Sequence, residues 1–149
     1  MNFLIVTGLS GAGKSMAVNA LEDIGFFCID NIPAGLLPRI LDFAQQGENQ
    51  LSRVAVVMDI RGLHSVQETN EALEALDEKK MPYDILFLDA SDAAIRRRYK
   101  ETRRVHPMTI SEGIPVSEAI TKERQILQPL RERAKYVIDT SLLSTAQKP

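Results

Sequence analysis

The chain has 149 residues, a formal net charge of −2 and one cysteine. This length predicts one domain with a single core, the charge argues against nucleic-acid binding through overall charge, and one cysteine excludes an internal disulfide. No apolar run approaches the ~20 residues of a membrane helix and the N-terminus lacks a basic signal region, so we expect a soluble, cytoplasmic protein without membrane contacts.

The first predicted strand covers residues 3–6, and a glycine-rich turn follows it directly. Residues 8–15 fit the pattern Gly-x-x-x-x-Gly-Lys-Ser/Thr, which is typical of a phosphate-binding loop between a strand and a helix. A chance glycine-rich turn is the alternative. We predict that nucleotide phosphates bind to Gly8, Leu9, Ser10, Gly11, Ala12, Gly13, Lys14 and Ser15, with Lys14 on the β and γ oxygens and the Ser15 hydroxyl on Mg²⁺.

Helices and strands then alternate through the middle of the chain. Apolar spacing and turn residues predict a helix over 16–24, a strand over 26–29, a helix over 37–44, a strand over 54–58, a helix over 65–80 and a strand over 83–88. These three strands end at Asp30, Asp59 and Asp89. We interpret Cys28, within 26–29, as a buried strand residue rather than a reactive thiol.

The last third of the chain begins with an arginine-rich helix capped by Ser91 or Asp92. Residues 105–115 lack periodicity and contain two prolines and a glycine, so they predict a loop or lid in which His106 is a simple loop residue. An apolar helical stripe resumes over 116–130, where Pro129 predicts a kink or a break. The final strand is expected over 136–138.

Five strands that alternate with helices predict an α/β fold with a parallel sheet and helices on both faces. The phosphate loop makes this a P-loop NTPase, and analogy with kinase-like folds gives the strand order 2-3-1-4-5. Ligands then bind at the carboxyl edge of the sheet, where the loop and the strand-end aspartates meet.

Asp59 and Asp89 are both candidates to position the Mg²⁺. We favour Asp59 because the third strand neighbours the first in the expected order; a turn-capping role is the alternative for either residue. Asp30, at the end of the second strand, is a candidate to orient an acceptor hydroxyl or a water, or else a turn residue.

The basic run from Arg96 to Lys100 is expected to form a solvated helix face, with Glu101 as an ion-pair partner. Arg103 and Arg104 lie at the helix end, where a guanidinium can close over the phosphates and neutralise charge during phosphoryl transfer, or simply favour the helix terminus. The same run could instead contact the phosphate backbone of RNA. It has one aromatic neighbour, Tyr99, which is too few for a platform on which bases stack. No Asn-Lys-x-Asp stretch is present, so ATP and GTP both remain open.

The chain resembles the RapZ/YvcJ family of P-loop nucleotide-binding proteins, also called RNase adapter proteins. The resemblance rests on residues 6–15, 20–33, 86–90, 98–107 and 137–141. Within these, Asp-Asn-Ile-Pro at 30–33 and Glu-Thr-Arg-Arg-Val-His-Pro at 101–107 are more specific than the phosphate loop, which many families share.

The resemblance implies binding of ATP or GTP with weak hydrolysis. The resemblance also implies a regulatory role found in some family members. In that role the protein presents a small RNA to an endoribonuclease, under the control of amino-sugar supply. The sensing and much of the RNA binding are attributed to a second domain, so residues 1–149 are expected to be the amino-terminal nucleotide-binding domain of a longer protein.

Three functional hypotheses follow. The first is a Mg²⁺-dependent nucleotide-binding domain with slow hydrolysis that regulates a second domain or a partner, with homo-oligomerisation left open. The second is a small-molecule kinase that uses Asp30 and Asp59 toward an acceptor hydroxyl. The third is an RNA-binding module that uses residues 96–104.

Overall fold

The computed structural model describes residues 2–30, 32–45, 53–58, 66–78, 80 and 82–142. Its centre is a five-stranded parallel sheet in the order β2-β3-β1-β4-β5. The strands are β1 (Asn2–Gly8), β2 (Phe27–Ile29), β3 (Arg53–Val57), β4 (Asp84–Asp89) and β5 (Tyr136–Asp139). The predicted fold class and strand order are therefore confirmed.

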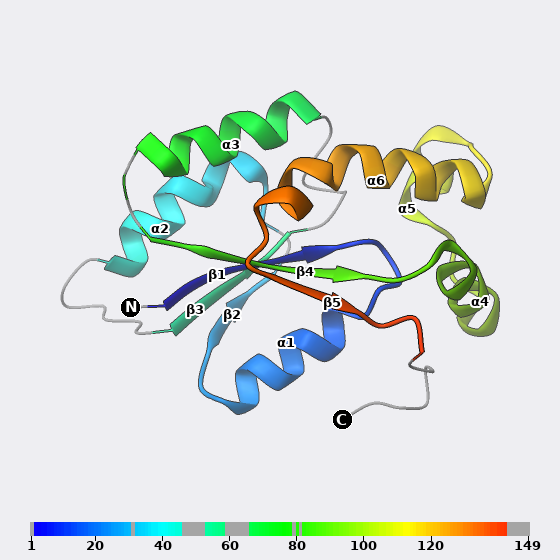
Figure 1. Ribbon diagram of the computed structural model, residues 1–149, viewed down its shortest axis with the longest axis horizontal. Helices are drawn as coiled ribbons and strands as arrows, with labels where there is room; N and C mark the ends of the chain where they lie inside the picture. The colour runs from blue at the N-terminus through cyan, green and yellow to red at the C-terminus, as the bar shows by residue number, and fades with distance from the viewer. Residues whose placement is uncertain are drawn as a thin grey trace.

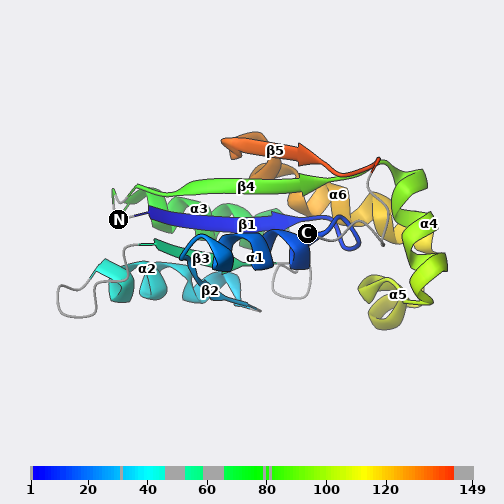
Figure 2. The same ribbon diagram turned by 90° about the horizontal axis from the view of Figure 1, so that it is seen from below.

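Helices cover both faces of the sheet (Figure 1). On one face lies α1 (Lys14–Asp23), and on the other lie η1 (Ala34–Leu36), α2 (Leu37–Gln45), α3 (Val66–Glu78) and α6 (Val116–Arg133). The helices α4 (Asp92–Thr102) and α5 (Pro107–Glu112) lie beyond the carboxyl ends of the strands, as the view from below also shows (Figure 2). They flank the edge at which parallel α/β sheets bind ligands.

The central strand separates two hydrophobic clusters. Phe3 and Ile5 of β1 belong to the large cluster with the buried residues of α2, α3 and α6, whereas Val6 belongs to a small cluster with residues of β3 and β4. Because successive strand side chains point to opposite faces, one strand supplies both clusters. This buried strand leads directly into the glycine-rich turn.

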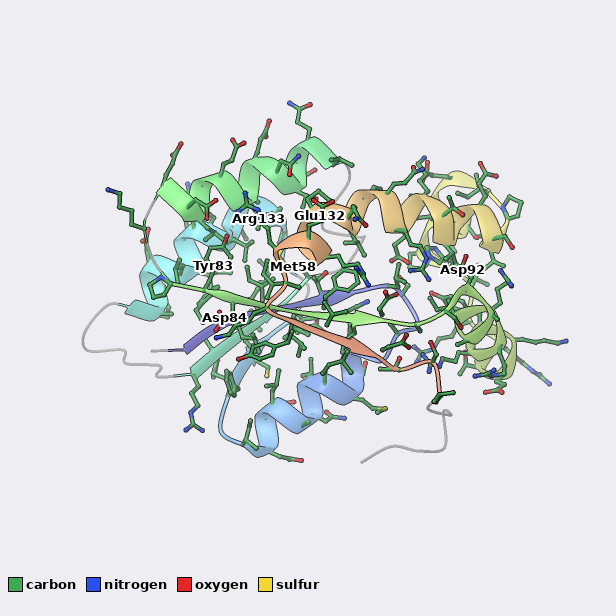
Figure 3. The ribbon with its side chains drawn as sticks, in the orientation of Figure 1. Met58, Tyr83, Asp84, Asp92, Glu132 and Arg133 are labelled. Atoms are coloured by element: carbon green, nitrogen blue, oxygen red, sulfur yellow. The ribbon has the colours of Figure 1, made fainter. Side chains whose placement is uncertain are left out.

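An ion-pair cluster joins α3, α6 and the start of β4. The guanidinium of Arg133 donates to Asp77 Oδ2 at 2.7 Å, and the Tyr83 hydroxyl donates to Asp77 Oδ1 at 3.0 Å. The hydrogen bond and charge of Arg133 hold the pKa of the Asp77 carboxyl below its usual value. In Figure 3, Tyr83 and Asp84 lie near the start of β4, whereas Asp92 lies beyond its carboxyl end. This cluster therefore fastens the end of the molecule opposite the phosphate loop.

Two expectations about local structure are corrected. Residues 107–112 form the helix α5 rather than a loop: His106 caps its start, Pro107 occupies the first turn, and Gly113 ends it with φ 68°. The helix α6 runs unbroken through Pro129, with Leu127 and Leu130 buried on either side. A proline removes one N–H group, and this packing offsets the loss, so the predicted break into two helices is wrong, whereas the alternative of a kink at Pro129 stays a prediction.

No helix within the described ranges is both long enough and apolar enough to cross a membrane. The predicted helix start at Ser65 and the strand-end residue Asp59 lie outside the described residues.

Candidate functional site

The glycine-rich turn connects β1 to α1 through backbone that other residues adopt poorly. A Cβ atom on Gly8, which has φ 151°, would lie 2.2 Å from the carbonyl oxygen of Leu88 in β4. Gly13 has φ 101° and caps α1 without a side-chain hydrogen bond. The left-handed backbone and the close strand contact explain why glycine stands at these positions.

The carbonyl groups of this loop are held by side chains of the protein. The Lys14 ammonium donates to the carbonyl oxygens of Gly8 at 2.9 Å and Leu9 at 3.1 Å. The Arg98 guanidinium donates to Gly11 O at 3.0 Å, and the Thr140 hydroxyl donates to Ala12 O at 2.8 Å. The loop carbonyls therefore turn toward the body of the protein.

Several loop N–H groups have no such partner. Within the described part of the chain, no hydrogen bond takes up the N–H groups of Gly11, Gly13 and Ser15. The first turn of α1 also contains no acidic residue, and Ser15 is exposed there. Unpaired N–H groups and the positive end of a helix dipole together form an anion site, so this loop fits a bound phosphate.

Arg98 donates a hydrogen bond to the loop, whereas among the described residues no hydrogen bond joins Arg103 or Arg104 to it. Arg103 ends α4 with φ 55°, and the side chains of Arg103 and Arg104 are both exposed. Arg98 instead joins Gly11 to the carbonyl and hydroxyl oxygens of Thr140. Burial lowers the pKa of the Arg98 guanidinium, and the charge of Arg97 adds to this effect. Sequence reasoning missed Arg98 because it lies inside a run of cations.

A buried acid, Glu123 of α6, contacts the loop at Ser10. Its carboxylate accepts hydrogen bonds from the Ser10 N–H at 3.1 and 3.0 Å and from the Ser10 hydroxyl at 2.7 Å. It also lies 3.0 Å from Nε2 of His106, and both of these side chains are fully buried. The expectation that His106 is a simple loop residue is therefore wrong.

A signal for Glu123 was present in the sequence. The apolar stripe of α6 includes Ala119, Ile120, Leu127 and Leu130, and Glu123 falls on the same helical face. A charged residue at a core position of a helix needs a buried partner, so this placement indicates a polar network.

The strand-end acids differ in their surroundings. Asp89, at the end of β4, accepts hydrogen bonds from Arg124 at 3.0 Å and Arg131 at 3.2 Å. Asp30 is exposed at the end of the edge strand β2. Asp59 lies outside the described residues, and among the residues that are described no group of three or more His, Cys, Asp or Glu side chains is arranged to hold a metal ion.

Cys28 is half-buried in β2, with its thiol near the carbonyl oxygens of Val18 and Phe26. Burial raises the pKa of this thiol, and the negative charge of Glu22 adds to the shift. A thiol with a raised pKa is a poor nucleophile, which agrees with a packing role.

The parallel sheet in the order β2-β3-β1-β4-β5 and the glycine-rich loop after β1 define the kinase-like P-loop fold. The chain matches the family described as RapZ-like N-terminal domain over residues 1–148, and it belongs to this family.

Relatives of the chain carry the name nucleotide-binding protein. One from Moorella thermoacetica is 50% identical over 148 residues, which cover 97% of this chain and 48% of the relative. Another from Alkaliphilus oremlandii is 46% identical over 147 residues, which cover 99% of this chain and 50% of the relative. The chain thus spans about half the length of the curated relatives that it matches.

Solved structures show the same fold at low sequence identity. The Deinococcus radiodurans tunicamycin resistance protein superposes with a TM-score of 0.59 and 14% identity, covering 99% of this chain and 90% of that one. Shikimate kinase from Bacteroides thetaiotaomicron superposes with a TM-score of 0.56 and 16% identity, covering 98% and 91%. At these identities the likeness concerns the fold.

Proposed function

We propose that this chain is a nucleotide-binding domain that takes ATP or GTP together with Mg²⁺ and hydrolyses it slowly. The main support is that the carbonyl and N–H groups of the phosphate loop differ in their partners. Lys14, Arg98 and Thr140 bind its carbonyl groups. The N–H groups of Gly11 and Gly13 have no partner among the described residues. Such a loop favours an anion over a cation at its mouth.

In this proposal the residues at the start of α1 hold the nucleotide. Lys14 exchanges its two loop carbonyl partners for phosphate oxygens, and the exposed Ser15 hydroxyl and Asp59 hold Mg²⁺. A bound Mg²⁺ supplies charge neutralisation between the phosphates. The balance favours binding because an ammonium pairs more strongly with an anion than with a neutral carbonyl.

Slow hydrolysis agrees with the positions of Arg103 and Arg104. Both are exposed at the end of α4, so they act on the phosphates only after this segment closes over the loop. Charge neutralisation by an arginine contributes strongly to phosphoryl transfer, and its absence from the open loop lowers the rate.

The relatives are about twice as long as this chain, and we propose that the nucleotide state of this domain regulates the remainder of such a protein. A small RNA and an endoribonuclease are the proposed partners, acting mainly through that remainder. This role belongs in the cytoplasm, where nucleotides and RNA are both present. The exposed cations Arg96, Arg97 and Lys100 of α4 offer this domain a secondary, salt-sensitive contact with RNA phosphates.

The first test is isothermal titration of the chain with Mg·ATP and with Mg·GTP. Lys14→Ala is expected to weaken binding of the preferred nucleotide by at least about tenfold, equivalent to about 1.4 kcal/mol, because a charge-assisted contact is lost. Lys100→Ala, which removes an exposed lysine from α4, is the matched control and keeps the wild-type affinity. Equal affinity of wild type and Lys14→Ala would contradict nucleotide binding by this loop.

A small-molecule kinase is the second candidate, because the strand order is kinase-like and Asp30 is exposed at the carboxyl end of β2. Incubation with Mg·nucleotide and a panel of metabolites separates the two functions. Phosphate release without an acceptor supports the regulatory domain, whereas a phosphorylated metabolite supports the kinase.

A further inference from the structure

A chain of hydrogen bonds joins Ser10 of the phosphate loop to Glu123 and His106; Ser10 is half-buried, whereas the other two side chains are buried. Glu123 has 0% exposure and His106 has 1%. They come from α6 and from the start of α5, two consecutive helices that are far from the loop in the sequence, since Glu123 lies 113 positions after Ser10. A carboxylate buried this deeply is tolerated only when donors replace the water it has lost.

The hydrogen bonds of His106 fix its tautomer. Its Nδ1 accepts a hydrogen bond from the Met108 N–H at 3.0 Å, so Nδ1 carries no proton. The ring proton is therefore on Nε2, which donates to Glu123 Oε1 at 3.0 Å. In this way the cap of α5 orients the donor that faces Glu123.

Ser10 supplies the other donors to the carboxylate, through both its N–H group and its hydroxyl. If Ser10 moved away, the buried Glu123 would keep the His106 donor alone among its partners in the described part of the chain. Leaving a buried polar group unsatisfied is costly, so the carboxylate resists displacement of the loop. While the Ser10 N–H donates to Glu123, the carbonyl oxygen of the next residue, Gly11, accepts a hydrogen bond from Arg98. The Gly11 N–H has no partner among the described residues.

Tyr99 of α4 packs beside the same part of the loop. A Cβ atom on Gly11 would lie 3.6 Å from the Tyr99 ring, and the centroids of the Tyr99 and His106 rings are 5.7 Å apart. The loop therefore contacts Tyr99 of α4 and Glu123 of α6, and His106 at the start of α5 contacts both of these side chains.

We propose that Glu123 and His106 are positioning residues for the phosphates: acting through Ser10, they hold the loop in the conformation that presents its N–H groups to the anion. This inference rests on the proposed nucleotide binding. It assigns the two buried residues a part in affinity that is separate from packing, although neither touches the ligand.

Titration of matched variants with Mg·ATP and Mg·GTP tests this role. Glu123→Gln is expected to weaken the nucleotide affinity about tenfold, within the usual range of coupling between sites, because the amide brings N–H groups against the Ser10 and His106 donors. Ser10→Ala keeps the N–H donor and is expected to cost about threefold. The matched control is Glu118→Gln, the same change at an exposed position of α6, and it keeps the wild-type affinity.

The double variant Ser10→Ala/Glu123→Gln distinguishes positioning from general loss of stability. It is expected to bind no more weakly than Glu123→Gln alone, since the hydroxyl acts through the carboxylate; independent losses would instead add.

An NMR measurement reports on His106 directly. The chain has two histidines, His64 and His106, so His64→Gln leaves one set of imidazole ¹⁵N signals. These signals are expected to show the Nε2–H tautomer and to shift when Mg·nucleotide is added to the wild-type loop, but not when it is added to Lys14→Ala.

The outcomes separate two failures. If Lys14→Ala loses binding while Glu123→Gln and Ser10→Ala keep wild-type affinity, the positioning role is overturned and nucleotide binding stands. If Lys14→Ala binds like wild type, the proposed function itself fails. If circular dichroism shows that Glu123→Gln is unfolded, the Ser10→Ala affinity decides: a wild-type value would overturn the positioning role.

Discussion

Tyr99 shows how one half-buried side chain links the loop to the pH dependence of the protein. Burial raises the pKa of its phenol far above the usual value, and the negative charge of Glu123 adds to the shift. A hydrogen bond with Ser10 and the charge of Arg104 act in the opposite direction but are weaker. The phenol therefore stays protonated in the folded chain at pH values where it ionises in the unfolded chain.

The sign of the resulting pH dependence is fixed by this shift. Because the folded-state pKa is raised, the stabilising contribution of Tyr99 is complete below about pH 10, the unfolded value, and is lost as the pH rises toward the folded value. We expect Tyr99→Phe to reduce the loss of unfolding free energy above about pH 10, since phenylalanine has no proton to release. Urea unfolding across this range measures it, and an unchanged pH dependence in Tyr99→Phe would contradict the expectation.

At the scale of residues, the sequence predicts those positions whose chemistry is local. The glycines, Lys14 and Ser15 are recognisable because their spacing alone defines the loop. Arg98 and Glu123 are not, because their partners Gly11 and Ser10 lie 87 and 113 positions away along the chain. Such contacts depend on how the helices pack, which local spacing does not encode.

At the scale of elements, the end of β5 is tied to the phosphate loop. The Thr140 hydroxyl donates to Ala12 O at 2.8 Å, lies 3.2 Å from Asp89 O and accepts from Arg98 at 3.0 Å. One side chain thus joins the loop, β4, β5 and α4. The edge strand thereby supports the loop although β4 separates β5 from β1.

Replacing Thr140 by valine tests this connection. Valine keeps the shape but removes the hydroxyl, so the buried Ala12 carbonyl loses a donor and we expect the free energy of unfolding to fall by about 1–2 kcal/mol in urea. Thr140→Ser keeps the hydroxyl and is expected to cost less. Thr121→Val, at an exposed position of α6, is expected to change stability by less than about 0.5 kcal/mol. Equal losses for Thr140→Val and Thr121→Val would mean that the connection contributes nothing.

Helix boundaries also show where sequence reasoning succeeds and where it does not. Ser91 caps α4 as one of the two predicted caps, because its hydroxyl accepts the Ala94 N–H at 3.1 Å. The helix α5 was missed because its residues have little apolar periodicity, and its stability comes from the His106 cap and the buried Met108. Short helices held by caps and tertiary contacts give weak periodic signals.

At the scale of the whole molecule, the strand order decides which strand ends surround the loop. β1 lies between β3 and β4, so the carboxyl ends of these two strands flank the strand that leads into the loop. The order was predicted only by analogy with kinase-like folds, since sequence periodicity identifies strands but not their neighbours. Sequence spacing also did not predict that Asp89 pairs with Arg124 and Arg131, because these arginines of α6 lie 35 and 42 positions away along the chain.

This arrangement yields a prediction about the magnesium ligand. The Asp89 carboxylate is already bound by Arg124 and Arg131, and binding a metal there would require these ion pairs to break. The strand β3 lies on the other side of β1 from β4 and ends at Val57, two positions before Asp59 in the sequence. We therefore propose Asp59 as the residue that positions Mg²⁺.

The test compares nucleotide affinity in Mg²⁺ with affinity in EDTA for two matched variants. Asp59→Asn is expected to reduce the Mg²⁺-dependent gain in affinity by about tenfold, because a hard cation prefers a carboxylate to an amide. Asp89→Asn is expected to keep this gain but to lower the free energy of unfolding by about 1.5–3 kcal/mol, since two arginines lose a charged acceptor. Loss of the Mg²⁺-dependent gain in Asp89→Asn, with Asp59→Asn unaffected, would instead assign the metal to Asp89, and the Arg124 and Arg131 contacts would then have to open when nucleotide binds.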